Sequence, residues 1–322
     1  MMSLPDFRYK LIAIHLAGGS RERLKFKADN IVVENEDKQV LFQHSCHRLF
    51  ALFIIGEISL TSILIKHAIA FAFPIILMNR NMKVITRINC AAEGNTLLRM
   101  KQYTAKNRNF IIAQQLIHQK ISNQTSLLSA LRTPSKQTTQ SLHRLRAIDV
   151  SQATTTQELM GIEGNASKLF FSAYFHPLGW NRREPRCKRD IYNVLLDIGY
   201  TYLFNFIEAM LSLYGFDLFC GVHHTFFYQR MSLVCDIVEP FRCIIDRRIR
   251  KAYNLKQINP DDFIFKDNQY QLSWEKQAPY IALFLKDILE EKESIFRFCQ
   301  AYYRWFMQDK PIHTFPVYRI NQ

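Results

Sequence analysis

The sequence predicts an α+β protein, in which a small N-terminal β-rich domain with one packed helix precedes a larger all-helical domain. In the first ninety residues, β-branched and aromatic residues come in short runs that turn-forming residues separate, which is typical of strands. From Asn95 on, apolar residues recur with the 3.6-residue period of helices and few β runs interrupt them. The change near Glu93 and Gly94 predicts two domains, residues 1–93 and residues 94–322.

The N-terminal domain is expected to contain seven strands and one helix. A continuous apolar strand ends at Gly56, and residues 60–70 then have helical spacing. A turn at residues 79–81 separates the last two strands. The expected strands cover residues 9–16, 24–27, 30–34, 40–43, 49–55, 74–78 and 83–88.

Three helices of the second domain can be placed in order. Thr155 and Glu158 form a capping box, which predicts a helix start. One stripe of apolar residues then predicts a core helix over residues 190–214, and Gly215 is a suitable C-terminal stop. Residues 274–307 are expected to form a further helix, continuous or interrupted, before the tail.

Composition narrows the function classes. The 42 Lys and Arg residues exceed the 28 Asp and Glu residues by 14, which favours a polyanionic partner, either nucleic acid or an anionic membrane surface. Glu57, Lys66 and Pro74 interrupt the most apolar stretch, so no membrane span is expected there. The N-terminus lacks the pattern of a secretory signal, and the seven cysteines form no C-x-x-C pair. We therefore expect a cytoplasmic protein with reduced thiols.

Basic residues are concentrated in the helical domain. Between Glu93 and Asp149 there are nine basic residues and no acid, whereas a solvated helical face usually mixes both signs. Two further basic clusters follow, and we predict that these groups contact DNA phosphates. The candidate DNA-binding residues are Arg99, Lys101, Lys106, Arg108, Arg144, Arg146, Arg182, Arg183, Arg242, Arg247 and Arg248.

Glu163 stands between two glycines, Gly161 and Gly164, in about the third turn of the predicted helix. A glycine inside a helix costs about 1 kcal/mol relative to alanine, so its presence needs a reason. One reason is the close approach of another backbone or of a nucleic acid, and the other is helix packing beside an exposed glutamate. These residues alone do not decide between the two explanations for the glycines.

A second group combines His223 and His224 with Asp236 and Glu239. The two acids are three positions apart and share one face if the segment is helical. Carboxylates with one imidazole suit Mg²⁺ or Mn²⁺. Histidine pairs and such acid pairs are both common, so the spacing alone favours an ordinary arrangement over a metal site.

The order of these motifs resembles a known family. Glu163 with its glycines, the run 181–183 leading to residues 193–196, His224 and the segment from Asp236 to Asp246 look like the CRISPR-associated integrase and endonuclease of spacer acquisition, CRISPR-associated protein one. Residues 49–88 also resemble that family's strand, Gly, helix, strand and hairpin unit. Three positions depart from the family pattern: Phe170, Asp197 and Cys243.

The resemblance implies a metal-dependent enzyme. Glu163, His224 and Glu239 would be the catalytic residues and would hold Mg²⁺ or Mn²⁺, with Asp236 as a further candidate ligand or a group behind the ligands. The family joins 3′-hydroxyl ends of a protospacer duplex to the borders of a CRISPR repeat by transesterification. It forms a homodimer through its N-terminal domain, and CRISPR-associated protein two bridges two such dimers.

Two alternatives stay open in the sequence. The same metal site would serve a nuclease that cuts branched or single-stranded DNA without integration. A non-catalytic nucleic-acid-binding scaffold would carry the same excess of basic residues.

Overall fold

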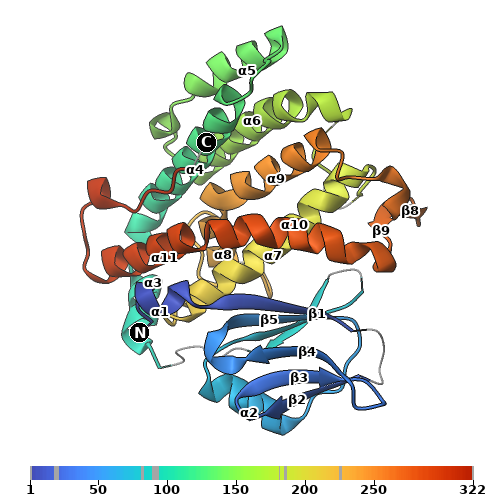
Figure 1. The fold of residues 1–322 in the computed structure, drawn as a ribbon. Helices are drawn as coiled ribbons and strands as arrows, with labels where there is room; N and C mark the ends of the chain where they lie inside the picture. Colours follow the sequence, from blue (N-terminus) through green and yellow to red (C-terminus); the bar gives the residue numbers. More distant parts are fainter. Residues whose placement is uncertain are drawn as a thin grey trace. The chain divides into compact units, whose positions relative to one another are not determined.

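A computed structural model describes residues 2–17, 22–80, 83–88, 94–180, 182–184, 187–224 and 227–320, and only the backbone of Lys106 and Asn107. A β-rich N-terminal part precedes a largely helical part, which confirms the predicted fold class (Figure 1). The chain divides into two compact units. The first comprises Met1–Thr96 and Glu208–Phe216, and the second comprises Leu97–Ile207 and Asp217–Gln322. Glu93, one of the two residues at the predicted boundary, lies outside the described residues.

Two sheets build the first unit. Strands β1, β5 and β6 are parallel neighbours, and β7 pairs antiparallel with β6. All seven residues of β5 are buried, as its unbroken apolar sequence requires. The second sheet is antiparallel, in the order β2, β3, β4. The strands are β1 (Leu11–Leu16), β2 (Arg23–Lys27), β3 (Asn30–Glu34), β4 (Val40–Ser45), β5 (Leu49–Ile55), β6 (Ile75–Met78) and β7 (Val84–Ile88).

One helix, α2 (Ser62–Ala70), packs on this unit. The Thr61 side chain accepts a hydrogen bond from the Leu64 amide and so caps its first turn. A short helix, α1 (Leu4–Arg8), precedes β1, where no helix was expected. The expected turn after β6 includes Asn81, which lies outside the described residues.

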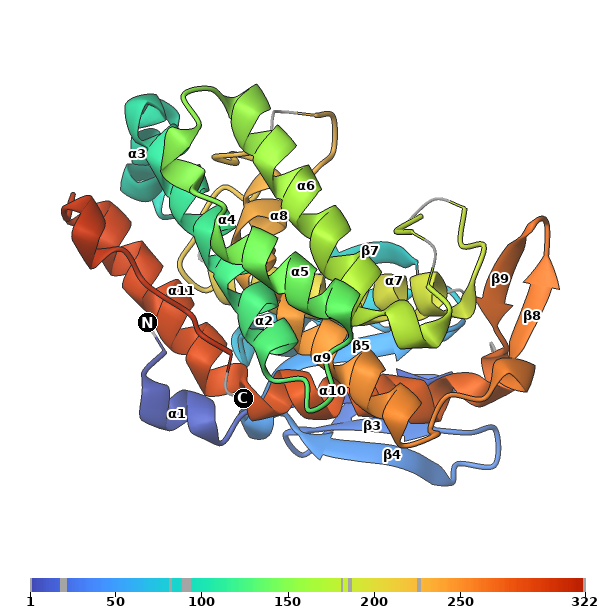
Figure 2. The same ribbon diagram turned by 90° about the horizontal axis from the view of Figure 1, so that it is seen from above.

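The second unit is built mainly from helices. Helices α4, α5 and α6 pack against one another and run side by side in Figure 2. The Thr155 hydroxyl accepts a hydrogen bond from the Glu158 amide at 3.2 Å, so α6 begins where the capping box predicts. The helices are α3 (Thr96–Thr104), α4 (Lys106–Ser129), α5 (Lys136–Arg146), α6 (Thr156–Tyr174), α7 (Ile191–Ser212), α8 (Ser232–Val238), α9 (Arg242–Asn254), α10 (Gln277–Glu290) and α11 (Lys292–Met307). Short 3₁₀ turns are η1 (Cys46–Arg48), η2 (Val150–Gln152), η3 (His176–Leu178), η4 (Glu239–Phe241), η5 (Pro260–Asp262), η6 (Trp274–Lys276) and η7 (Ile312–Thr314).

Helix α7 is the apolar core helix that the sequence predicts. It is long and apolar enough to cross a membrane, but 83% of its most apolar window is buried inside the protein. At Gly199 a Cβ would lie 2.5 Å from Ile245 and 3.0 Å from Phe284. Glycine at this position therefore allows α9 and α10 to approach α7 closely.

The C-terminal part contains the expected helix, which is interrupted, and a hairpin that was not expected. Residues 274–307 form η6, α10 and α11, with the interruption at Glu291. A hairpin of β8 (Phe263–Lys266) and β9 (Gln269–Leu272) precedes them and was not expected. Its strands have four residues each, which is too short for a clear alternating pattern, and Asp267 and Asn268 form its turn with positive φ.

Candidate active site

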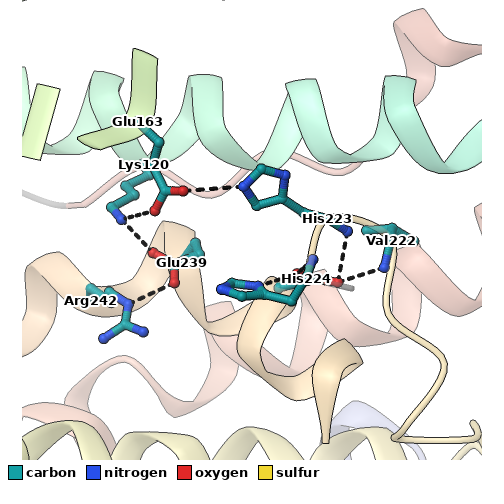
Figure 3. A network of polar contacts seen from close by, with 8 residues as sticks. Lys120, Glu163, Val222, His223, His224, Glu239 and Arg242 are labelled. Atoms are coloured by element: carbon teal, nitrogen blue, oxygen red, sulfur yellow. Dashed lines mark hydrogen bonds and ion pairs between the residues drawn. The ribbon is translucent and has the colours of Figure 1, made fainter. Parts of the chain in front are cut away.

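Several elements of the helical unit bring charged side chains to one cavity of about 580 Å³. Helix α4 contributes Lys120, α6 contributes Glu163, η4 contributes Glu239 and α9 contributes Arg242. The loop between α7 and α8 contributes His224. Figure 3 shows these side chains as one network. The fold thus places Glu163, His224 and Glu239, which are far apart in the sequence, on the wall of one cavity.

Lys120 lies between the two candidate carboxylates. Its Nζ is 2.5 Å from Oε1 of Glu163 and 2.7 Å from Oε2 of Glu239. Nε of Arg242 is 2.9 Å from the other oxygen of Glu239. Lys120 is 8% exposed and Glu239 is 3% exposed, so these charges are compensated inside the protein. In the sequence, Lys120 is only one of the nine basic residues between Glu93 and Asp149, because nothing in the spacing links it to either acid.

The carboxyl groups and the amine of this network are ionised. Burial raises the pKa of Glu163, but the Lys120 ammonium and His223 outweigh burial, and the pKa lies well below its usual range. Burial also raises the pKa of Glu239, but Arg242 and Lys120 lower it further than burial raises it. For Lys120, burial lowers the pKa and the two carboxylates more than restore it. Both carboxylates and the ammonium are therefore charged at neutral pH.

The two adjacent histidines have different partners. Nε2 of His223 is 3.1 Å from Glu163, and Nδ1 of His224 is 2.6 Å from Asp236. Figure 3 shows the His223 ring directed toward Glu163 and the His224 ring on the Glu239 side of the network. Because the contact of His224 uses Nδ1, its Nε2 is the nitrogen that a cation could take. Asp236 is thus the acceptor that orients His224.

Asp236 also holds the loop that carries the histidines. Its carboxylate accepts the backbone N–H groups of residues 222, 223 and 224, at 2.6, 3.1 and 3.0 Å. At Gly221 a Cβ would lie 2.6 Å from Cβ of Ser232 and 2.8 Å from Oδ2 of Asp236. The loop therefore packs on α8 so closely that only glycine fits at its start.

The two glycines beside Glu163 are not explained by packing within the chain. Apart from the backbone of α6 itself and the adjacent residues, no atom of the described residues lies within 4 Å of the position that a Cβ would take at Gly161 or at Gly164. Gly164 lines the cavity beside Glu163. Of the two readings that the sequence leaves open, these open positions favour the approach of a ligand over helix packing.

Three buried oxygens of the cavity wall have no hydrogen-bond partner among the described residues: Oε2 of Glu239, which has its ion pair with Lys120, Oε1 of Gln124 and Oδ2 of Asp246. Gln124 is 3% exposed and Asp246 is 1% exposed. The other oxygen of Asp246 accepts the Tyr200 hydroxyl at 2.5 Å, and burial raises the pKa of Asp246 to about 7. Unpaired buried oxygens are uncommon, so they indicate that a cation or a hydrogen-bond donor enters this cavity.

The residues present fit a divalent cation. A single positive group already bridges Glu163 and Glu239, and carboxylates with one imidazole suit Mg²⁺ or Mn²⁺. In the part of the chain that the structure describes, no three carboxylate, imidazole or thiol groups stand together as a coordination cluster. The Lys120 ammonium instead occupies the position between the two carboxylates.

Some of the predicted DNA-binding residues are accessible. Arg144 and Arg146 are exposed on α5, and the Arg182 side chain is 68% exposed. Arg183 and Arg242 line the cavity itself. Arg182, Arg183 and Arg242 give the cavity wall a basic character.

Other members of that set have partners within the chain. Lys101 and Arg108 both bind Asp309, at 2.5 and 2.9 Å, and so tie α3 and α4 to the end of α11. Arg99 is half-buried, Arg247 pairs with Glu291 at 3.3 Å, and the Lys106 side chain lies outside the described residues.

The expectation was wrong for Arg248. It is 3% exposed, and its guanidinium forms a two-pronged ion pair with the equally buried Asp287. Its position on the inner face of α9 removes it from any DNA-binding surface. The sequence run of basic residues conceals this because one of its members points into the core.

The fold and the site define a class of protein, an α+β protein whose helical unit holds two carboxylates and an imidazole in a basic cavity. The chain belongs to the Cas1 family, since residues 18–286 match the family model described as CRISPR associated protein Cas1. This confirms the resemblance seen in the sequence.

Two relatives are named CRISPR-associated endonuclease Cas1 1. That of Thermodesulfovibrio yellowstonii is 30% identical over 229 residues, which cover 67% of this chain and 72% of the relative. That of Archaeoglobus fulgidus is 25% identical over 295 residues, which cover 83% of this chain and 84% of the relative.

Solved structures share the fold. A Cas1 protein from Thermotoga maritima has a TM-score of 0.80 at 19% identity and covers 97% of this chain and 100% of its own. A casposase bound to its integration product has a TM-score of 0.76 at 18% identity, over 97% of this chain and 96% of its own. A Cas6-RT-Cas1–Cas2 complex gives a TM-score of 0.81 at 22% identity, over 98% of this chain but only 36% of that longer chain.

Proposed function

We propose that this protein is a divalent-cation-dependent DNA integrase of spacer acquisition, which joins 3′-hydroxyl ends of a short duplex to the borders of a CRISPR repeat. The observation that carries this proposal is the pairing of Glu163 and Glu239 through one positive group inside a basic cavity. Membership of the Cas1 family supports it, as do the relatives named endonucleases and a structural neighbour bound to an integration product.

Glu163, Glu239 and Nε2 of His224 are the groups that would hold Mg²⁺ or Mn²⁺. When bound, the cation would neutralise charge on the attacked phosphate and make the 3′-hydroxyl a better nucleophile. The two carboxylates are kept ionised by their neighbours, so they need not lose protons before binding. Asp236 would act behind His224 by fixing its orientation, because its oxygens are engaged by the loop and the imidazole.

The cavity wall would bind the DNA backbone. Arg183 is fixed by hydrogen bonding to Asn193 at 2.8 Å and by an ion pair with Asp197, so its guanidinium is held in one place. Arg242 joins the carboxylate site to this wall, since it pairs with Glu239 and lines the cavity. Such contacts position phosphates without reading sequence, and their strength falls as salt rises.

The N-terminal domain, residues 1–93, is assigned to dimerisation and partner contacts. CRISPR-associated protein two, Cas2, would bridge two dimers and hold the duplex between them. A structural neighbour whose title names both Cas1 and Cas2 in one complex supports this assignment. The proposed place of action is the cytoplasm, where the DNA substrates are.

A joining assay with two kinds of DNA end tests this function. The full-length protein and its small partner are incubated with Mn²⁺, a plasmid carrying a CRISPR repeat, and a short duplex that ends in either 3′-hydroxyl or 3′-dideoxy nucleotides. We expect covalent joining at repeat borders only with 3′-hydroxyl ends and no product with chelator. Cutting that ignores the chemistry of the end would establish the nuclease instead, and DNA binding without any product would establish the scaffold.

A further inference from the structure

Lys120 stands where the proposed function requires a divalent cation. Its Nζ lies 2.5 Å from Glu163 and 2.7 Å from Glu239, in the middle of the candidate ligand set. An ammonium and a divalent cation repel each other strongly at such distances inside a protein. A cation that binds both carboxylates must therefore displace this ammonium.

The same cavity offers the ammonium a second position. Oε1 of Gln124 and Oδ2 of Asp246 are buried and line the cavity together with Lys120, and neither has a hydrogen-bond partner in the part of the chain that the structure describes. Gln124 follows Lys120 by four residues on α4, so both side chains lie on one face of the helix. Lys120 is also close enough to Asp246 to lower the pKa of that carboxyl. The flexible four-carbon stem of lysine allows the ammonium to move between such positions.

We propose that Lys120 is a two-position counter-ion, which neutralises Glu163 and Glu239 before a divalent cation binds and moves to Asp246 and Gln124 when it does. This inference rests on the proposed function, since it needs a cation on those two carboxylates. It explains how the buried Glu239 and the half-buried Glu163 are stable as carboxylates in the unloaded protein. It also makes Lys120 a competitor that weakens the apparent affinity for the cation.

A Mn²⁺ titration without DNA tests the competition. Free Mn²⁺ is measured by its electron paramagnetic resonance signal in solutions of the full-length protein. Lys120→Met is expected to bind Mn²⁺ about tenfold tighter than the unchanged protein, or more. Lys168→Met is the matched control, because Lys168 also lines the cavity and its removal changes the local charge equally. We expect a clearly smaller change in this control.

A double-mutant cycle tests the second position. Asp246→Asn removes the carboxyl group that would receive the ammonium, so it should weaken Mn²⁺ binding when Lys120 is present. In the Lys120→Met background the same substitution should have no effect, because no ammonium has to move. Thermal unfolding in chelator adds a readout of stability, in which Lys120→Met should be less stable than the unchanged protein and recover with Mn²⁺.

The outcomes separate this inference from the proposed function. Equal Mn²⁺ affinity of Lys120→Met and the unchanged protein would overturn the counter-ion role. If Asp246→Asn weakens Mn²⁺ binding equally with Lys120 present and in the Lys120→Met background, the second position of the ammonium is overturned. If Lys120→Met does not fold, the single Asp246→Asn variant still tests the second position. An unchanged affinity of this variant for Mn²⁺ would overturn that position. Absence of any Mn²⁺ binding would instead remove the cation site on which both rest.

Discussion

Two buried clusters of charge in the helical unit serve different purposes. Arg248 and Asp287 satisfy each other completely between α9 and α10, and each is 3% exposed. The cluster of Lys120, Glu163 and Glu239 opens instead onto a cavity whose wall has unpaired oxygens. An ion pair that is enclosed by protein offers no group to a ligand. Charged side chains that face a cavity can exchange one partner for another. We call the first the closed pair and the second the open cluster. A buried charge alone therefore does not indicate a ligand-binding site. Buried charges beside oxygens that lack hydrogen-bond partners do indicate one.

Loss of a carboxylate from the open cluster should abolish function. Glu163→Gln removes a negative charge from the proposed cation site, and we expect the rate of strand joining to fall by about 10³-fold or more. Lys120 keeps Glu239 as a partner, so the free energy of unfolding should fall less than in Asp287→Asn. Joining rates with Mn²⁺ and urea unfolding measure the two effects. An active Glu163→Gln protein would contradict the assignment of this site.

Loss of a carboxylate from the closed pair should act on stability. Asp287→Asn leaves the buried Arg248 without a counter-charge and should cost about 3–5 kcal/mol of unfolding free energy. Urea unfolding measures this cost. The fraction that remains folded should join DNA at the normal rate, and a rate loss per folded molecule would remove the distinction between the clusters.

The loop that carries His224 should be sensitive to one added methyl group. Gly221→Ala places a Cβ within 3 Å of both Ser232 and Asp236 and should push the loop off α8. A displacement of His224 by about 1 Å can cost about 100-fold in rate, and we expect a loss of joining of that size. A normal joining rate would show that the loop tolerates the shift and that His224 is not held as described.

Asp246 lies on the cavity wall and should make the stability of the folded protein depend on pH. Because burial raises its pKa to about 7, the folded protein keeps a proton that the unfolded chain releases near pH 4. Its contribution to stability is therefore full in acid and is lost as the pH rises toward 7. The melting temperature of the unchanged protein minus that of Asp246→Asn should fall between pH 4 and pH 7 and then level off. A difference that stays constant over this range would contradict the raised pKa.

Much of the fold follows from local patterns. The capping box at Thr155, the apolar strand that forms β5 and the apolar stripe of α7 each reflect interactions within a few residues. The hairpin of β8 and β9 was missed because four-residue strands carry little periodic signal.

The site was predictable only in part, because its contacts are not local. The candidate acids and His224 came from motif order, but the partnership of Lys120 with Glu163 spans 43 positions of the chain and has no sequence signature. Arg248 was misplaced for the same reason, since its partner Asp287 lies on another helix. The identity of a partner in a buried charge network depends on packing rather than on spacing.

The position of the cation is the central claim, and anomalous diffraction from crystals of the full-length protein grown with Mn²⁺ tests it most directly. We expect one anomalous peak at about 2.1 Å from oxygens of Glu163 and Glu239 and from Nε2 of His224, with the Lys120 ammonium displaced. No peak at these groups, with Lys120 still between the two carboxylates, would contradict it.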